Sequence, residues 1–331
     1  MIVTRRKAKG IGLLSGGLDS TLAAKILQAQ DVDVLCVTFL TMFFGADPGI
    51  KAGKTFGIPV HALDIGEKHL EMLKNPISGY GRHMNPCIDC HALMLREAGR
   101  FMEEAGADFL FTGEVLGQRP MSQRRDALKK VENLAGYPGR ILRPLSARLL
   151  PPTLVEIEGR VDRERLLDIH GRSRKRQMAL AEHYGITDYP QPGGGCILTK
   201  EGFGRKLNIL LKRFPNAAAR EVELLKRGRH FILPEGGMCI VGRNETDNDK
   251  LESLADSKDI LLRLSDHIGP IGLLLPSANF EKDLGLAATA VIAYSDAPLS
   301  VPVKIEWQHE EKKGTLSWVN TGKDHLRSYQ V

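Results

Sequence analysis

The chain has few cysteines and no long apolar run, and each shortage excludes a class of protein. Five cysteines in 331 residues are too sparse, and odd in number, for a secreted disulfide framework. No apolar run approaches the ~20 residues that a membrane-spanning helix needs. The first ten residues, MIVTRRKAKG, lack the apolar segment of a secretory signal. We therefore expect a protein of the reducing cytoplasm with no membrane partner.

An excess of one charge is also nearly absent. Lys and Arg number 46 against 40 Asp and Glu, which gives a formal net charge of +6. This balance is compatible with a nucleic-acid partner but does not require one. The length allows two domains, and 42% hydrophobic with 26% charged residues is ordinary for a globular protein.

A glycine turn between a strand and a helix opens the chain, in IGLLSGGLDSTLAAKILQ at residues 11–28. Gly16 and Gly17 allow positive φ and a close approach of backbone to a ligand. The N–H groups of such a turn, with the positive end of the following helix, attract anions. A Walker loop is excluded, because it needs a lysine that residues 12–24 lack.

The residues after the turn indicate a nucleotide. Ser20 and Thr21 stand where they can cap the helix or donate to a phosphate oxygen. Asp19 would repel phosphate, but it suits an Mg²⁺ ion bound against the nucleotide. SGGLDS resembles the PP-loop of the ATP pyrophosphatases. The resemblance implies that ATP is split between its α and β phosphates and that AMP is attached to a carbonyl oxygen.

Buried strand patterns alternate with helical patterns beyond this loop. This alternation predicts an α/β fold with a doubly wound parallel sheet and a ligand at the carboxyl ends of its strands. The expected strands lie within residues 32–40, 56–65, 104–114 and 139–147, and the clearest helices within 20–30 and 91–105.

Three cysteines form a second candidate site. Cys87 and Cys90 make a C-x-x-C, and Cys196 follows far downstream in a Gly/Pro loop. Three thiolates suit a [4Fe–4S] cluster with one iron free to carry sulfide. The same residues suit persulfide chemistry that ends in a disulfide. Unrelated buried thiols are the third interpretation.

A further motif, TGEVLGQRPMSQ at 112–123, follows a buried strand, and RILRPL follows at 140–145. With SGGLDS, these segments resemble the catalytic domain of the tRNA 4-thiouridine synthases over residues 8–200. The cysteine pattern resembles cluster-dependent tRNA thiolation enzymes, including those that make 2-thiouridine. The resemblance implies an ATP site at Ser15, Gly16, Gly17, Asp19 and Ser20, with Gly113, Glu114 and Gln118 near the nucleotide, and sulfur handling at Cys196 beside Cys87 and Cys90. Because the PP-loop begins at residue 15, we expect neither the usual N-terminal RNA-binding modules of those synthases nor their rhodanese-like domain.

Two basic segments flank these motifs, at 118–130 and 159–186. Arginine suits phosphate because its guanidinium makes paired hydrogen bonds. We expect the segments to form a positive rim for tRNA. A solvated helical face with no RNA partner is the alternative, because it would have the same charge pattern. The candidate RNA contacts are Arg124, Arg125, Arg172, Arg174, Lys175 and Arg176.

The last third of the chain changes character. Residues 200–228 indicate a helical connector, and the V-G-R-N-x-x-x-N-D-x-L pattern at 241–251 resembles the RNA-binding domain of the NFACT family over 229–331. Arg243 is the candidate RNA contact there, and a structural turn network is the alternative. Residues 261–267, LLRLSDH, lack the tryptophan usual in that family, which argues against base stacking at this point.

The sequence therefore predicts a PP-loop domain at 1–199, a connector at 200–228 and an NFACT-like domain at 229–331. The expected function is an ATP-dependent tRNA sulfurtransferase that uses Mg²⁺, with sulfide or a cysteine desulfurase as sulfur donor. We favour 4-thiouridine as the product. Wobble 2-thiouridine, or a non-catalytic RNA-associated nucleotide-binding protein, are the alternatives.

Overall fold

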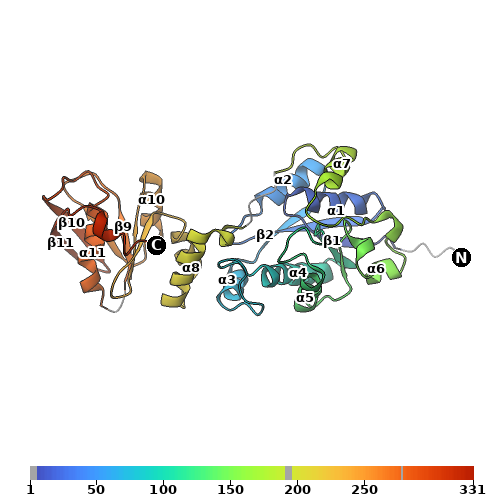
Figure 1. Cartoon of the computed structure of the whole chain (residues 1–331), viewed down its shortest axis with the longest axis horizontal. Coiled ribbons are helices and arrows are strands. Elements are labelled where there is room, and N and C mark those ends of the chain that lie inside the picture. Colours follow the sequence, from blue (N-terminus) through green and yellow to red (C-terminus); the bar gives the residue numbers. More distant parts are fainter. Residues whose placement is uncertain (1–5, 191–195, 277–278) are drawn as a thin grey trace. The chain divides into compact units, whose positions relative to one another are not determined.

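The computed structural model describes residues 6–190, 196–276 and 279–331. The chain divides into two compact units, residues 1–199 and 200–331. Each unit has a sheet and a hydrophobic core of its own (Figure 1). None of the helices in the described residues is long and apolar enough to cross a membrane.

The first unit is built on a five-stranded sheet in the order β3-β2-β1-β4-β5, with every pair parallel. Strand β1 pairs with β2 on one side and with β4 on the other, so the winding reverses between β1 and β4. In open parallel sheets, ligands bind beyond the carboxyl ends of the strands at such a reversal. The strands are β1 (Lys9–Leu13), β2 (Asp33–Leu40), β3 (Val60–Asp64), β4 (Phe109–Phe111) and β5 (Ile141–Leu142).

Helices cover both faces of this sheet, with α1, α2 and α7 on one side and α3, α4 and α5 on the other (Figure 1). Successive strand residues face opposite sides, so Phe109 and Phe111 join the core beneath α1 while Leu110 joins the core beneath α4. The prediction of a doubly wound α/β sheet is confirmed. The helices are α1 (Leu18–Gln28), α2 (Asp47–Phe56), α3 (Gly66–Lys74), α4 (Cys87–Glu104), α5 (Arg125–Ala135), α6 (Leu154–Ile157) and α7 (Lys175–His183).

Two glycines inside β1 explain how its large neighbours fit. A Cβ atom at Gly10 would lie 2.7 Å from the Phe109 ring, and one at Gly12 would lie 2.2 Å from the Phe111 ring. The pair of small residues thus makes room for two aromatic side chains of β4, which are both fully buried. This close packing fixes β4 against β1, where the candidate site begins.

The second unit holds a six-stranded antiparallel sheet in the order β11-β10-β8-β9-β7-β6. Helix α11 packs on it through alanines and branched residues such as Val291 and Ile292, which are fully buried. Tyr294 and Ser295 follow α11 and lead toward β10. The elements are α8 (Glu201–Arg213), α9 (Ala219–Leu224), β6 (Arg229–Ile232), β7 (Met238–Val241), α10 (Glu245–Leu254), β8 (Ile260–Leu264), β9 (Gly272–Leu275), α11 (Phe280–Ile292), β10 (Pro302–His309) and β11 (Lys312–Val319).

Candidate functional site

The glycine turn after β1 has the backbone that the sequence predicts. Gly16 has φ of 80°, a conformation that favours glycine, and a Cβ atom there would lie 2.4 Å from the carbonyl oxygen of Pro48. Gly17 is extended, with φ of −84°, and caps helix α1. The turn therefore needs glycine at Gly16 for two independent reasons, its left-handed backbone and its contact with α2.

The hydroxyl groups beside the turn bind mainly to its own backbone. Ser20 Oγ donates to the Gly17 carbonyl at 2.9 Å, and Thr21 Oγ1 donates to the same oxygen at 3.2 Å. Thr21 is fully buried, whereas Ser15 is exposed and its Oγ lies 3.3 Å from that of Ser20. Ser15 is thus the hydroxyl that faces solvent at the loop, and Thr21 secures the first turn of α1.

Asp19 is held by the segment that follows β4. Its Oδ2 accepts a 2.7 Å hydrogen bond from Gln118 Nε2, while its Oδ1 is buried and has no hydrogen-bond partner among the described residues. A carboxylate oxygen without a donor, beside an anion-binding turn, fits a magnesium ligand. Gly113 makes this approach possible, because a Cβ atom there would lie 2.4 Å from the backbone nitrogen of Ser20.

Glu114 forms the centre of a buried ionic cluster. Its Oε2 accepts from Arg143 Nε and from Thr112 Oγ1, each at 3.0 Å, and its Oε1 lies 3.0 Å from His91 Nδ1. Burial raises the pKa of Glu114, but Arg143 and His91 outweigh it and hold the pKa at about 2. Arg143 also pairs with Glu132. Both carboxylate oxygens of Glu114 are therefore engaged by the protein, and its expected role near the nucleotide stays a prediction.

The three candidate cysteines are electrostatic neighbours. Cys87 begins α4, Cys90 lies one turn later, and Cys196 precedes a short 3₁₀ turn at Ile197–Thr199. Burial first, and then the charges of Cys196 and Cys87, raise the pKa of the Cys90 thiol. Burial also raises the pKa of Cys196, with Cys87 adding to the shift. The chain thus brings together thiols that are more than one hundred residues apart in the sequence.

A histidine that the sequence analysis missed adjoins these thiols. His69 Nε2 lies 3.3 Å from Cys90 Sγ, and the rings of Phe43 and Phe44 pack against the imidazole. Burial lowers the pKa of His69 to about 4, so it is neutral near pH 7. No local pattern marks this histidine, which sits on α3 among charged surface residues.

Among residues 6–190, 196–276 and 279–331, no group of three or more His, Cys, Asp or Glu side chains is arranged to hold a metal ion. The [4Fe–4S] cluster that the sequence allowed as one alternative stays a prediction. The other two cysteines, Cys36 and Cys239, are buried in strands β2 and β7.

One segment contacts Asp19 after the glycine turn and also His91, the neighbour of Cys90. Gly113 and Gln118 touch Asp19 and its neighbour, as described above. Glu114 contacts His91, the residue after Cys90, and the charge of Arg119 lowers the pKa of Cys87 against the effect of burial. Residues 113–119 therefore connect the anion-binding turn to the cysteine helix.

The two predicted basic segments of the first unit lie next to one another. Leu116 and His170 form a parallel bridge, and Gly171 N donates to the Leu116 carbonyl at 2.8 Å. Most of the candidate side chains are exposed, with Arg176 paired to Asp168 at 2.7 Å. The candidate side chains lie where two helices begin, with Arg124 and Arg125 at α5 and Arg172, Arg174, Lys175 and Arg176 at α7, and the positive rim that they would form stays a prediction.

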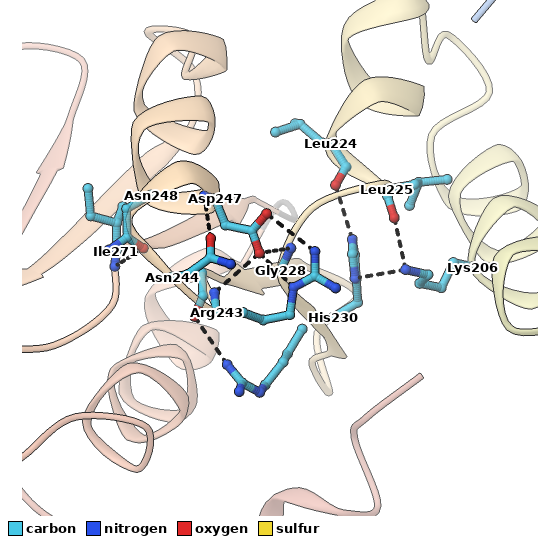
Figure 2. A network of polar contacts seen from close by, with 12 residues as sticks. Lys206, Leu224, Leu225, Gly228, His230, Arg243, Asn244, Asp247, Asn248 and Ile271 are labelled. Carbon is cyan, nitrogen blue, oxygen red and sulfur yellow. Dashed lines mark hydrogen bonds and ion pairs between the residues drawn. The ribbon is translucent and has the colours of Figure 1, made fainter. Parts of the chain in front are cut away.

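The polar motif of the second unit serves the fold (Figure 2). Asn244 caps α10 by accepting from Asp247 N at 2.9 Å, and Asp247 accepts from Arg243 Nε at 2.6 Å and from Gly228 N at 3.1 Å. Asn248 accepts from Ile271 N at 3.1 Å. This is the structural turn network named above as the alternative. Arg243 keeps 48% of its side chain exposed, so RNA contact there stays a prediction.

Comparison with known proteins assigns a family model to each unit. Residues 6–148 match the thiamine biosynthesis protein (ThiI) family, and residues 228–330 match the NFACT protein RNA binding domain. The tRNA-specific 2-thiouridylase MnmA of Agrobacterium fabrum is 27% identical over 232 residues, which cover 62% of this chain and 54% of that protein. The same enzyme of Syntrophotalea carbinolica is 36% identical over 118 residues, covering 30% of this chain and 32% of that protein.

The chain spans about half the length, or less, of the curated relatives it matches. Among solved structures, the predicted subunit of a tRNA methyltransferase from Methanocaldococcus jannaschii gives a TM-score of 0.32 at 18% identity, covering 41% of this chain and 69% of that one. The family matches support the expected relation to PP-loop tRNA thiolation proteins and to the NFACT RNA-binding domain. They do not single out the 4-thiouridine synthases, because the relatives are named 2-thiouridylases.

Proposed function

We propose that this chain is an ATP-dependent tRNA thiolation enzyme that replaces a uridine carbonyl oxygen with sulfur. The observation that carries the proposal is the segment 113–119, which contacts Asp19 of the anion-binding turn and also the surroundings of Cys87 and Cys90. Activation of an oxygen by ATP and delivery of sulfur are two halves of one reaction. They require a nucleotide site and a thiol site that adjoin.

The first half-reaction takes place at the glycine turn. The turn and the start of α1 would supply N–H groups for the phosphates of ATP, and Oδ1 of Asp19, which has no hydrogen-bond partner among the described residues, would hold Mg²⁺. The ion would neutralise phosphate charge as pyrophosphate leaves. The uridine oxygen forms a bond to the α-phosphorus while the bond between that phosphorus and the bridging oxygen to the β-phosphate breaks. The product is an adenylated uridine, in which AMP is a good leaving group.

The second half-reaction takes place at the thiols. A sulfur atom held as a persulfide on one cysteine attacks the activated carbon, and the carbon–oxygen bond to AMP breaks. A second thiol then attacks the cysteine sulfur, which forms a disulfide and releases the thiolated nucleoside. Three thiols that are free and adjacent provide the carrier and the resolving partner. Cys87 and Cys90, one helical turn apart, are the pair we assign to the disulfide.

The product we propose is 2-thiouridine in place of the 4-thiouridine that the motifs favoured. The names of the curated relatives carry this choice. The substrate is tRNA, and the second unit supports this partner through its match to an RNA-binding domain. The exposed arginines at the starts of α5 and α7 give the first unit a positive rim for the same backbone phosphates.

Mass spectrometry of tRNA nucleosides from a deletion strain tests the proposal. Loss of a 2-thiouridine derivative, restored by the wild-type gene and not by Cys87→Ser or Cys90→Ser, is the expected result. Loss of 4-thiouridine alone would return the product to the first expectation. A complete set of thionucleosides would reject the enzyme and favour an RNA-associated nucleotide-binding protein. Cys239→Ala, at a buried thiol of the second unit, is the matched control and should restore the product.

A further inference from the structure

The Asp19 carboxylate is anchored by a chain of two amides that ends on helix α7. Gln118 Nε2 donates to Asp19 Oδ2 at 2.7 Å, and Gln177 Nε2 donates to Gln118 Oε1 at 3.0 Å. Gln177 is fully buried, although its neighbours Arg176 and Met178 are both exposed. A buried glutamine at the start of a basic helix therefore reaches, through one intermediate, the predicted magnesium ligand.

The chemistry of the three groups fixes the direction of this chain. A carboxylate oxygen only accepts hydrogen bonds, so Gln118 must present its amide nitrogen to Asp19. The carbonyl of Gln118 then faces Gln177, which must present its own nitrogen in turn. Both amide orientations follow from the acceptor at one end, and neither can be reversed without losing a hydrogen bond.

The acceptors at the two ends of the chain are unsatisfied. Oδ1 of Asp19 and Oε1 of Gln177 are buried and have no hydrogen-bond partner within the described parts of the chain. An unpaired buried polar atom costs about 1–3 kcal/mol. Stability alone would favour an apolar residue in place of Gln177, so the amide is better explained by what it orients than by what it stabilises.

We propose that Gln177 is a positioning residue for the nucleotide site and acts only through Gln118. It holds the Gln118 amide in the one orientation that engages Oδ2 of Asp19, which leaves Oδ1 directed to the metal. The inference rests on the proposed function, because it requires Mg²⁺ and ATP at the glycine turn. The two amides are uncharged, so the chain transmits geometry and not charge.

Calorimetric titration of the full chain with ATP, with and without Mg²⁺ and in the absence of RNA, tests this role. Gln177→Leu keeps the side-chain volume and removes the donor to Gln118. We expect MgATP affinity to fall roughly fivefold, the worth of one net hydrogen bond, while affinity for ATP in EDTA is unchanged. A merely structural role would weaken both forms alike and lower the unfolding midpoint. Gln28→Leu, at the far end of α1, is the matched control.

A double-mutant cycle with Gln118→Leu separates action through Gln118 from independent action. If Gln177 acts only through Gln118, then Gln177→Leu has no further effect on MgATP affinity once Gln118 is replaced. Additive losses, or an unchanged MgATP affinity in the single variant, would overturn the inference. A wild-type chain that fails to bind ATP would instead reject the proposed function itself, so the two failures are distinguishable.

Discussion

Each unit has a strand–turn–helix motif with an aspartate in the first turn of its helix, but the two aspartates differ in their hydrogen bonding. After β1, Asp19 keeps one buried oxygen without a partner in the described residues. After β7, Asp247 accepts from the Gly228 backbone and from the Arg243 backbone and side chain. Both acids lie in the first turn of a helix. Residue type is the same in the two motifs, so unused hydrogen-bonding capacity is the feature that supports the proposal of a ligand at Asp19 and a structural role at Asp247.

The largest expected effect is the loss of activity on replacing Asp19, and its absence would remove the contrast between the two aspartates. Asp19→Asn removes the charge that we propose to hold Mg²⁺, and we expect ATP-dependent pyrophosphate release to fall on the order of 10³-fold. Release is measured with tRNA present, and the unfolding midpoint should hardly change because Oδ1 has no partner to lose in the described parts of the chain. Asp31→Asn is the control, since Asp31 is exposed and its φ of 62° suits asparagine. An active Asp19→Asn enzyme would contradict the assignment.

In the second unit, replacing the aspartate should reduce stability instead of activity. Asp247→Ala leaves the N–H of Gly228 and the donors of Arg243 without their acceptor, which should lower the free energy of unfolding by about 2–3 kcal/mol. Urea denaturation measures this change. Asp249→Ala, two residues away and exposed, should stay within about 0.5 kcal/mol of wild type. A loss of tRNA binding in Asp247→Ala with no loss of stability would show that this network is a binding site after all.

Glu114 lies in the first unit, but like Asp247 it accepts hydrogen bonds from the protein, and we therefore expect it to contribute to stability. Its pKa of about 2 lies below the ordinary 4.5, so its contribution to stability is complete above pH 4.5 and disappears as pH falls toward 2. Glu114→Gln should flatten the pH dependence of unfolding in this window by on the order of 2 kcal/mol. Urea denaturation between pH 3 and 7 tests the effect. Glu104→Gln, at an exposed position of α4, should keep the wild-type dependence.

The smallest expected effect concerns RNA. The double reversal Arg174→Glu/Arg176→Glu should weaken tRNA binding about tenfold and reduce its salt dependence by roughly two phosphate contacts. Filter binding at several salt concentrations measures both quantities. Lys7→Glu/Arg140→Glu reverses two exposed charges that precede β1 and β5, at the opposite edge of the sheet. Equal losses in the two double variants would indicate a general charge effect and no localised rim.

Much of the fold was predictable because it depends on local patterns. The expected strands at 32–40 and 56–65 are β2 and β3, and the glycine turn leads into α1 as predicted. The signals for a buried strand, a glycine turn and the start of a helix each depend on a few neighbouring residues. The alternation of strands and helices predicted a doubly wound sheet, but the strand order and the reversal at β1 came from the structure.

The partners of buried polar side chains were not predictable in the same way. Gln177 lies in a run of exposed basic residues, and its contact is 59 positions away in the chain. His69 meets Cys90 across 21 positions. Arg143 stood in the quoted R-P-L segment, yet its partner Glu114 was assigned to the nucleotide. Such pairings depend on which loops the sheet brings to one edge. The hydrophobic periodicity of the sequence does not indicate them.

The contact at Gly113 has a consequence for how the first unit opens. The backbone of Gly113 lies against the backbone of Asp19 and Ser20 with no room for a single methyl group. The turn after β4 and the first turn of α1 are therefore in close contact. Local opening of one must release the other. The slowly exchanging amide protons of these two turns should therefore share a single protection factor in deuterium exchange, although ninety-odd residues of chain separate them.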